Sequence, residues 1–203
     1  PPKGTAATGI DALCHAIEAY VSKKSQPISD FIALEAIRLI SANLRTAWAN
    51  GTDVEARSNM MLGATLAGIA FSNASVTLIH GMSRPIGALF HIPHGVSNAA
   101  LLPVWAEYSY IGNVEKFAKV AEAMGENIVG LSTLDAAYMT YEAVKQLCED
   151  IQIPTISGLG IDKAEYEKHI PKMATDAIAS GSPGNNPRFA TPEDIMELYK
   201  KAW

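Results

Sequence analysis

The chain has 203 residues, of which 48% are hydrophobic and 18% are charged, and its formal net charge is −5. An acidic chain without a cluster of Lys and Arg is a poor match for nucleic acid, because phosphate contacts need concentrated positive charge. The two cysteines, Cys14 and Cys148, form no C-x-x-C pair, which argues against a disulfide framework and favours a reducing, cytoplasmic compartment.

Helical periodicity dominates the first half of the chain. Apolar residues recur at three- and four-residue spacing over residues 29–48 and predict one amphipathic helix. Residues 58–83 carry no formal charge, but polar residues interrupt the run and small residues dominate it. A membrane-spanning helix needs about 20 predominantly apolar residues. We therefore expect a buried core helix there and no contact with a membrane.

Four helix-start signals follow along the chain, each a hydroxyl or acidic residue with a carboxylate three positions later. They begin at Thr52, Ser132, Asp162 and Thr191. Evidence for strands is thin, since residues 76–79 and 151–156 contain β-branched residues but do not alternate. Residues 180–188 are rich in Gly, Pro, Ser and Asn and predict a loop. One all-α domain over residues 1–203 is the expected organisation.

Asp11 and His15 form the first group of residues that could bind a ligand. Their spacing of four places both side chains on one face of a helix, one turn apart. A carboxylate oxygen and an imidazole nitrogen in that arrangement can share a divalent cation at about 2.0–2.2 Å. A simple hydrogen bond within the helix is the alternative.

Three of the five histidines lie within residues 80–94. Glycines and prolines at positions 81, 85, 87 and 93 are expected to break the helix and to turn His80 and His94 toward a common point. Two buried, hydrogen-bonded histidines are the alternative interpretation. His91 is a rival ligand, ranked below His94 because Pro93 should start a new helix between them. His169 lies in a charged helix and is expected at the surface.

Together, Asp11, His15, His80 and His94 make a set of one oxygen and three nitrogen donors. Imidazole suits zinc and iron, and a carboxylate favours harder ions such as Fe²⁺. Other chemistries are weaker. Cys14 points to a different helix face from His15, and no serine sits in a G-x-S-x-G turn. No further catalytic residue is predicted beyond the four metal ligands.

These residues lie in segments that resemble the iron-dependent, or group III, alcohol dehydrogenases. Residues 1–18 resemble the first signature of that family, residues 80–103 resemble the second, and Asn186-Pro187-Arg188 is also similar. The resemblance implies a helical domain of dehydroquinate-synthase-like fold, with Asp11, His15, His80 and His94 as ligands of Fe²⁺ or, alternatively, Zn²⁺. It also implies oxidation of a small alcohol to an aldehyde or ketone, or the reverse, with NAD or NADP while the metal stabilises the alkoxide.

Two further positions follow from the same resemblance. Phe71 matches an aromatic position that lines the substrate pocket in some members, although a plain core Phe fits as well. Arg84 stands where many members have a histidine with a proton-relay or positioning role, and arginine cannot act as a base. Orienting an acidic substrate or the cofactor, and a structural ion pair, are the roles left open for Arg84.

The resemblance further places a nucleotide-binding half upstream of Pro1, which leads us to expect a piece of a longer protein that is inactive by itself. Homodimers are common among such enzymes, so a homodimer is a possible assembly. Two other functions remain alternatives: an all-α metal-dependent hydrolase, and a helical interaction domain that a metal stabilises.

Overall fold

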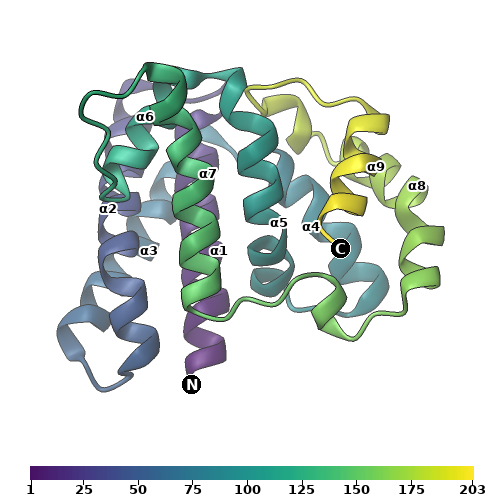
Figure 1. Cartoon of the computed structure of the whole chain (residues 1–203), viewed down its shortest axis with the longest axis horizontal. Coiled ribbons are helices and arrows are strands. Elements are labelled where there is room, and N and C mark those ends of the chain that lie inside the picture. Colours follow the sequence, from purple (N-terminus) through teal and green to yellow (C-terminus); the bar gives the residue numbers. More distant parts are fainter.

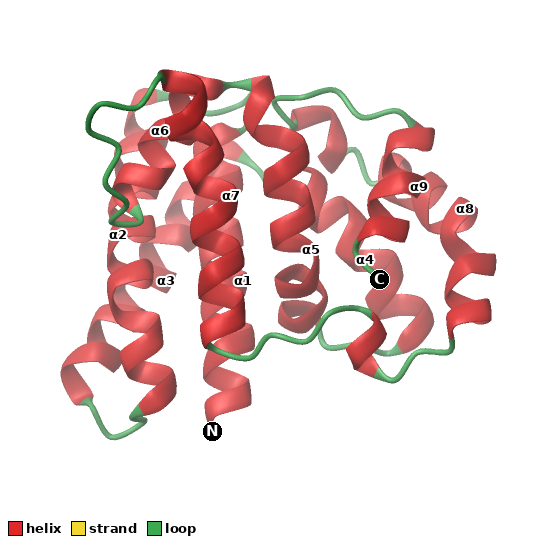
Figure 2. Cartoon of the chain, in the orientation of Figure 1, coloured by secondary structure: helices red, strands yellow, loops and turns green.

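The computed structural model describes all 203 residues and contains nine α-helices, three short 3-10 helices and no strand (Figure 2). The prediction of an all-α fold is confirmed. The helices are α1 (Pro2–Val21), α2 (Pro27–Ala49), α3 (Val54–Ala74), α4 (Leu78–Phe90), α5 (His94–Ser109), α6 (Val114–Ala123), α7 (Thr133–Asp150), α8 (Lys163–Ala179) and α9 (Pro192–Lys201). The 3-10 helices are η1 (Tyr110–Gly112), η2 (Ser157–Leu159) and η3 (Ser182–Asn185).

The helices form two groups that share one core (Figure 1). In the first group α1, α2 and α3 pack against one another, with α6 and α7 beside them. In the second, α4 packs against α5 and α8, and α9 packs against α8. Helix α5 also contacts α1 and α7 and so joins the groups. A single cluster of 46 buried residues runs through both.

The predicted helix starts are confirmed at three of four positions. The side chains of Ser132, Asp162 and Thr191 each accept a hydrogen bond from the backbone N–H three residues later. At the remaining start the cap is Asp53 and not Thr52, because the Asp53 carboxylate accepts the backbone N–H of Ala56. The predicted amphipathic helix over residues 29–48 is α2.

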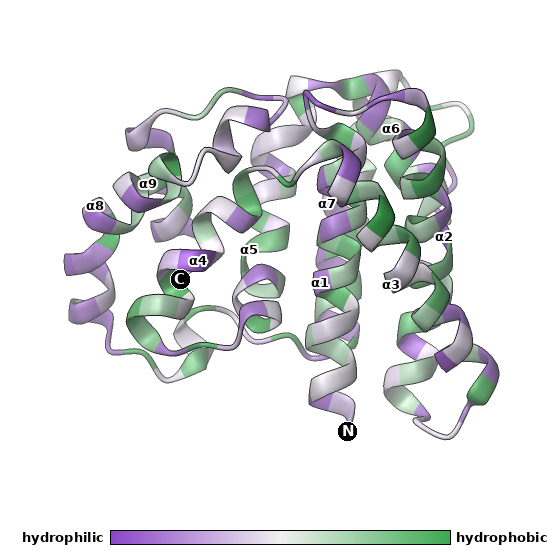
Figure 3. Cartoon of the chain, turned by 180° about the vertical axis from the view of Figure 1, so that it is seen from behind, coloured by the Kyte–Doolittle hydropathy of each residue, from purple (hydrophilic) through white to green (hydrophobic).

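The interpretation of residues 58–83 as one buried core helix is wrong. The run is divided between α3 and α4, and the buried residues of α3 are small: Ala56, Gly63, Ala67, Ala70 and Ala74. A Cβ atom on Gly63 would lie 2.7 Å from Cγ1 of Ile40, so α2 and α3 approach closely along this face. The large apolar side chains Val54, Met61, Leu62 and Ile69 are exposed. In Figure 3 hydrophobic segments recur along α2 and α3, whereas α8 is largely hydrophilic.

No single helix has the length and hydropathy of a membrane span. Helices α3 and α4 meet those criteria only as a pair, and the chain bends by 104° between them.

Helix α4 contradicts the expected breaks at positions 81, 85 and 87, because it runs without interruption through all three residues. Gly81 is needed for packing: a Cβ atom there would lie 2.7 Å from Cγ of Pro183 in η3. This close contact explains why glycine stands at position 81 despite its low helix propensity. The break comes later, where His91 adopts a left-handed conformation (φ 56°) and Pro93 caps α5, as predicted for Pro93. The loop predicted over residues 180–188 contains η3.

Candidate metal centre

Helix α1 carries Asp11 and His15 one turn apart, and both side chains are about one-fifth exposed. Helix α1 of the first group packs against α5 of the second, and α5 begins close beside it. That approach depends on Gly95, since a Cβ atom there would lie 2.7 Å from the carbonyl oxygen of Ala7. The absence of a side chain at Gly95 therefore lets the first turn of α5 bring His94 to Asp11.

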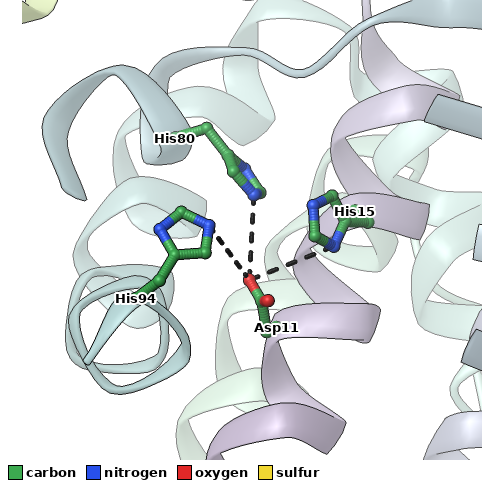
Figure 4. A group of neighbouring side chains, drawn as sticks. All are labelled: Asp11, His15, His80 and His94. Carbon is green, nitrogen blue, oxygen red and sulfur yellow. Dashed lines mark ion pairs between the residues drawn. The ribbon is translucent and has the colours of Figure 1, made fainter. Parts of the chain in front are cut away.

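The four predicted side chains converge at this place (Figure 4). Their donor atoms all lie within 4.8 Å of one another. From Oδ1 of Asp11 the distances are 3.7 Å to Nε2 of His80, 3.7 Å to Nε2 of His94 and 4.0 Å to Nδ1 of His15. Two donors that are each about 2.1 Å from one tetrahedral cation stand about 3.4 Å apart, so the observed spacing fits one divalent ion with a small contraction.

His80 is held from behind by a buried carboxylate. Glu18 is fully buried, and its Oε2 contacts Nδ1 of His80. Its Oε1 accepts hydrogen bonds from the Thr77 hydroxyl (2.7 Å) and the Ile79 backbone N–H (2.8 Å). A carboxylate can only accept, so Nδ1 of His80 carries the proton and Nε2 turns its lone pair toward Asp11. Carboxylate–histidine pairs of this kind orient the ligands of metal sites.

The environment keeps the charges in the form that metal binding needs. Burial, followed by the charge of His80, lowers the pKa of His15, and burial also lowers the pKa of His94. Burial alone would raise the pKa of Glu18, but the charge and hydrogen bond of His80, with the bonds from Thr77 and Ile79, lower it overall. Neutral imidazoles and ionised carboxylates are the forms that bind a cation.

The contacts of Asn98 indicate that the cluster suits a cation. It lies on α5 one turn after His94 and is fully buried. Its Nδ2 is 2.5 Å from Oδ1 of Asp11, 3.0 Å from Nε2 of His94 and 3.2 Å from Nε2 of His80, whereas its Oδ1 has no hydrogen-bond partner. An NH₂ group has only two hydrogens for these three acceptors. The cluster therefore has an excess of electron-pair donors around one point, which is the arrangement that suits a cation.

The remaining candidate residues take different places. The Phe71 ring stacks on His15 with centroids 4.4 Å apart. Arg84 is exposed and donates a hydrogen bond to Ser182. His91 is exposed, and His169 is half-buried on α8 with Nδ1 2.7 Å from the carbonyl oxygen of Glu165. Neither His91 nor His169 belongs to the cluster of donors.

Sequence reasoning missed two residues of this site, Glu18 and Asn98. A signal was present for both, because Glu18 follows His15 by three positions and Asn98 follows His94 by four, so each lies on the same helix face as a candidate ligand. Cys14 takes no part in the site. It is fully buried, and burial with the nearby charge of Asp11 raises the pKa of its thiol.

The fold is all-α, and one carboxylate and three imidazoles from its first, fourth and fifth helices converge on one point. These features define an all-α protein with a candidate site for a divalent cation. The model of the Fe-containing alcohol dehydrogenase family, C-terminal, matches residues 5–203. This chain belongs to that family.

Two enzymes are similar to this chain over its full length. It is 47% identical to 1,3-propanediol dehydrogenase of Klebsiella pneumoniae and 41% identical to lactaldehyde reductase of Escherichia coli, in each case over 100% of this chain and 52% of the relative. The crystal structure of a 1,3-propanediol oxidoreductase matches with a TM-score of 0.96 at 46% identity, again over 100% of this chain and 52% of that one. The chain thus spans about half the length of the relatives it matches.

Proposed function

We propose that the protein containing this chain is a metal-dependent, NAD(P)-linked alcohol dehydrogenase. It would oxidise a small alcohol to an aldehyde or ketone and catalyse the reverse reaction. The observation that carries the proposal is the convergence of one carboxylate and three imidazoles within 4.8 Å, at a place where the His94 side chain is 48% exposed. The names of the relatives, a propanediol dehydrogenase and a lactaldehyde reductase, support a small alcohol or aldehyde as the substrate.

We assign Asp11, His15, His80 and His94 as the ligands of one divalent cation. Iron is the first choice because of the family to which the chain belongs. Zinc is the alternative, since imidazole binds both metals and supply decides between them as much as the ligands do. The nucleotide would be NAD or NADP.

When bound, the cation supplies Lewis-acid stabilisation of negative charge on an alcohol or carbonyl oxygen, and a nicotinamide supplies the hydride acceptor or donor. Glu18 keeps the proton of His80 on Nδ1. Asp11 contributes the one negative charge among the four donors, and the N–H of Asn98 holds its Oδ1 in position. Phe71 covers the ring of His15 and shields that side from water.

Phe71 therefore contributes to the substrate side of the site in this proposal. A cytoplasmic homodimer stays an expectation for the whole protein. No observation in the fold or the site favours the hydrolase or the interaction domain over the dehydrogenase.

The test uses the full-length protein that contains this chain. We expect about one iron or zinc ion per chain by elemental analysis, and reduction of NAD⁺ or NADP⁺ in the presence of 1,3-propanediol. Treatment with a chelator should abolish turnover, and restoring the metal should recover it. If metal-free protein turned over the alcohol as fast as metal-loaded protein, the proposal would be wrong. Hydrolysis of a phosphate ester without nucleotide reduction would favour the hydrolase.

A further inference from the structure

Arg84 lies on α4 one helical turn beyond His80, so the two side chains leave the same face of the helix. Four residues of α-helix advance by about 6 Å along the axis. Arg84 therefore places a permanent positive charge beside the cluster of four donors.

The structure removes one of the roles that the sequence left open for Arg84. No carboxylate oxygen lies within 4.0 Å of its guanidinium, so it forms no structural ion pair. Of the other four arginines, Arg38 and Arg45 are each bound to an acidic partner, whereas Arg57 and Arg188 have none either. The one hydrogen bond of Arg84 runs from Nη1 to Oγ of Ser182, at 3.1 Å. A guanidinium has five N–H donors, and most of those of Arg84 have no acceptor in the chain.

The position of Arg84 is nevertheless supported. Ser182 is buried, and it belongs to η3, which packs tightly on α4 through the contact between Gly81 and Pro183. A neutral hydroxyl fixed by that packing orients the guanidinium without neutralising its charge. The remaining N–H groups form the planar fork that binds carboxylates and related anions through two hydrogen bonds.

The charges of the site also favour an anionic guest. Asp11 and Glu18 together carry two negative charges, which one divalent cation balances. Arg84 adds one positive charge to these groups, and no carboxylate of this chain pairs with it. A neutral diol leaves that charge as it is, whereas a singly charged acid balances it.

We propose that Arg84 is a specificity-determining residue that binds the anionic end of a short hydroxy acid, or of the corresponding oxo acid, whose other end faces the four donors. A carboxylate and a sulfonate share the required chemistry. The advance of about 6 Å between His80 and Arg84 suits an anion separated from the reacting carbon by one or two further atoms. This inference rests on the proposed dehydrogenase function and names its substrate class.

The experiment uses the metal-loaded, full-length protein and three alcohols that differ at one end: 1,3-propanediol, 3-hydroxypropionate and 2-hydroxyethanesulfonate. We expect kcat/KM to be higher for at least one of the two anions than for the diol. In Arg84→Gln the ratio of kcat/KM for that anion to kcat/KM for the diol should fall roughly 10- to 100-fold, the range for one hydrogen-bonded charge. Arg84→Lys should recover part of the ratio, because it keeps the charge but loses the fork.

A binding measurement supplies a second readout. Calorimetry with 3-hydroxypropionate or 2-hydroxyethanesulfonate in the absence of nucleotide should show binding to the wild type and loss of it in Arg84→Gln. A ratio that Arg84→Gln leaves unchanged would overturn the proposal. An equal rise in the nucleotide KM with all three alcohols would overturn it too, because Arg84 would then contact the cofactor. Absence of turnover with every alcohol, despite a bound metal, would instead refute the dehydrogenase function itself.

Discussion

The two sides of the candidate site are built in different ways, although one helix contributes to both. On α4, His80 is buried and held by Glu18, which in turn takes hydrogen bonds from Thr77 and Ile79. One turn later on the same helix, Arg84 is exposed and has a single hydrogen bond to a neutral hydroxyl. The side that would hold the cation is thus fixed by buried polar bonds, and the side that would meet the substrate is not. Substitutions on the first side should change metal content and stability, and those on the second should change substrate choice.

The largest effect is expected for His80→Ala. This variant removes a ligand and leaves Glu18 buried with no imidazole partner, a situation that typically costs about 3–5 kcal/mol of folding free energy. We expect bound metal to fall to background in elemental analysis and the denaturation midpoint to drop. His91→Asn is the matched control, because His91 is exposed, lies outside the cluster and has a left-handed backbone that Asn tolerates. If His91→Asn lost as much metal as His80→Ala, the metal loss could not be assigned to the removal of a ligand at His80.

The next largest effect is expected for Glu18→Gln. The amide keeps the shape and can still accept from Thr77, but it no longer fixes the tautomer of His80. Removing such a partner typically weakens metal affinity about 10- to 100-fold. Competition with a chromophoric chelator measures the affinity directly. A metal affinity equal to that of the wild type would mean that Glu18 serves the core alone.

Asn98→Ala should have a smaller effect on affinity and a clear effect on the geometry of the site. Its Nδ2 lies 2.5 Å from Oδ1 of Asp11, so removing the amide frees that carboxylate to turn. We expect the visible absorption of the Co²⁺-substituted protein to change in shape, with metal still bound. A spectrum identical to that of the wild type would show that Asp11 needs no help from Asn98.

The smallest effect on metal is expected for Phe71→Ala. Phe71 stacks on His15 but lies at the surface of the cluster and donates no electron pair. We expect metal content to stay near one ion per chain while KM for the alcohol changes severalfold. Steady-state kinetics beside elemental analysis separate the two readouts. Loss of the metal would instead show that Phe71 is needed to hold the metal ligands in place.

The sequence predicts most of this arrangement because the relevant signals are local. Pairs such as Asp11 and His15 need only the periodicity of one helix to be placed on one face, and the caps at Ser132 and Thr191 act within a single turn. Signals that depend on packing are missed. The continuity of α4 through Gly81 depends on a contact with Pro183, which is about 100 residues away in the chain.

The exposed face of α3 is a second example of the same limit. Hydropathy suggested a wholly buried helix, but the close approach of α2 is made by small residues such as Gly63, and large ones such as Met61 stay outside. The composition of a helix shows how apolar it is. It does not show which of its faces the neighbouring helices cover. Glu18 and Asn98 show that the same limit applies to the site. Their roles depend on contacts with residues of other helices, which the sequence does not show.

The distance in sequence between the donors has a further consequence for how the chain folds. His15 and His80 belong to helices that are separated by the whole of α2 and α3, so one ion bound to both would act as a reversible cross-link that closes a long loop. An ion that binds the folded chain and not the unfolded one stabilises the fold by mass action. All four donors come together only after α1, α4 and α5 have docked. Tight binding of the ion would therefore follow folding and would not initiate it.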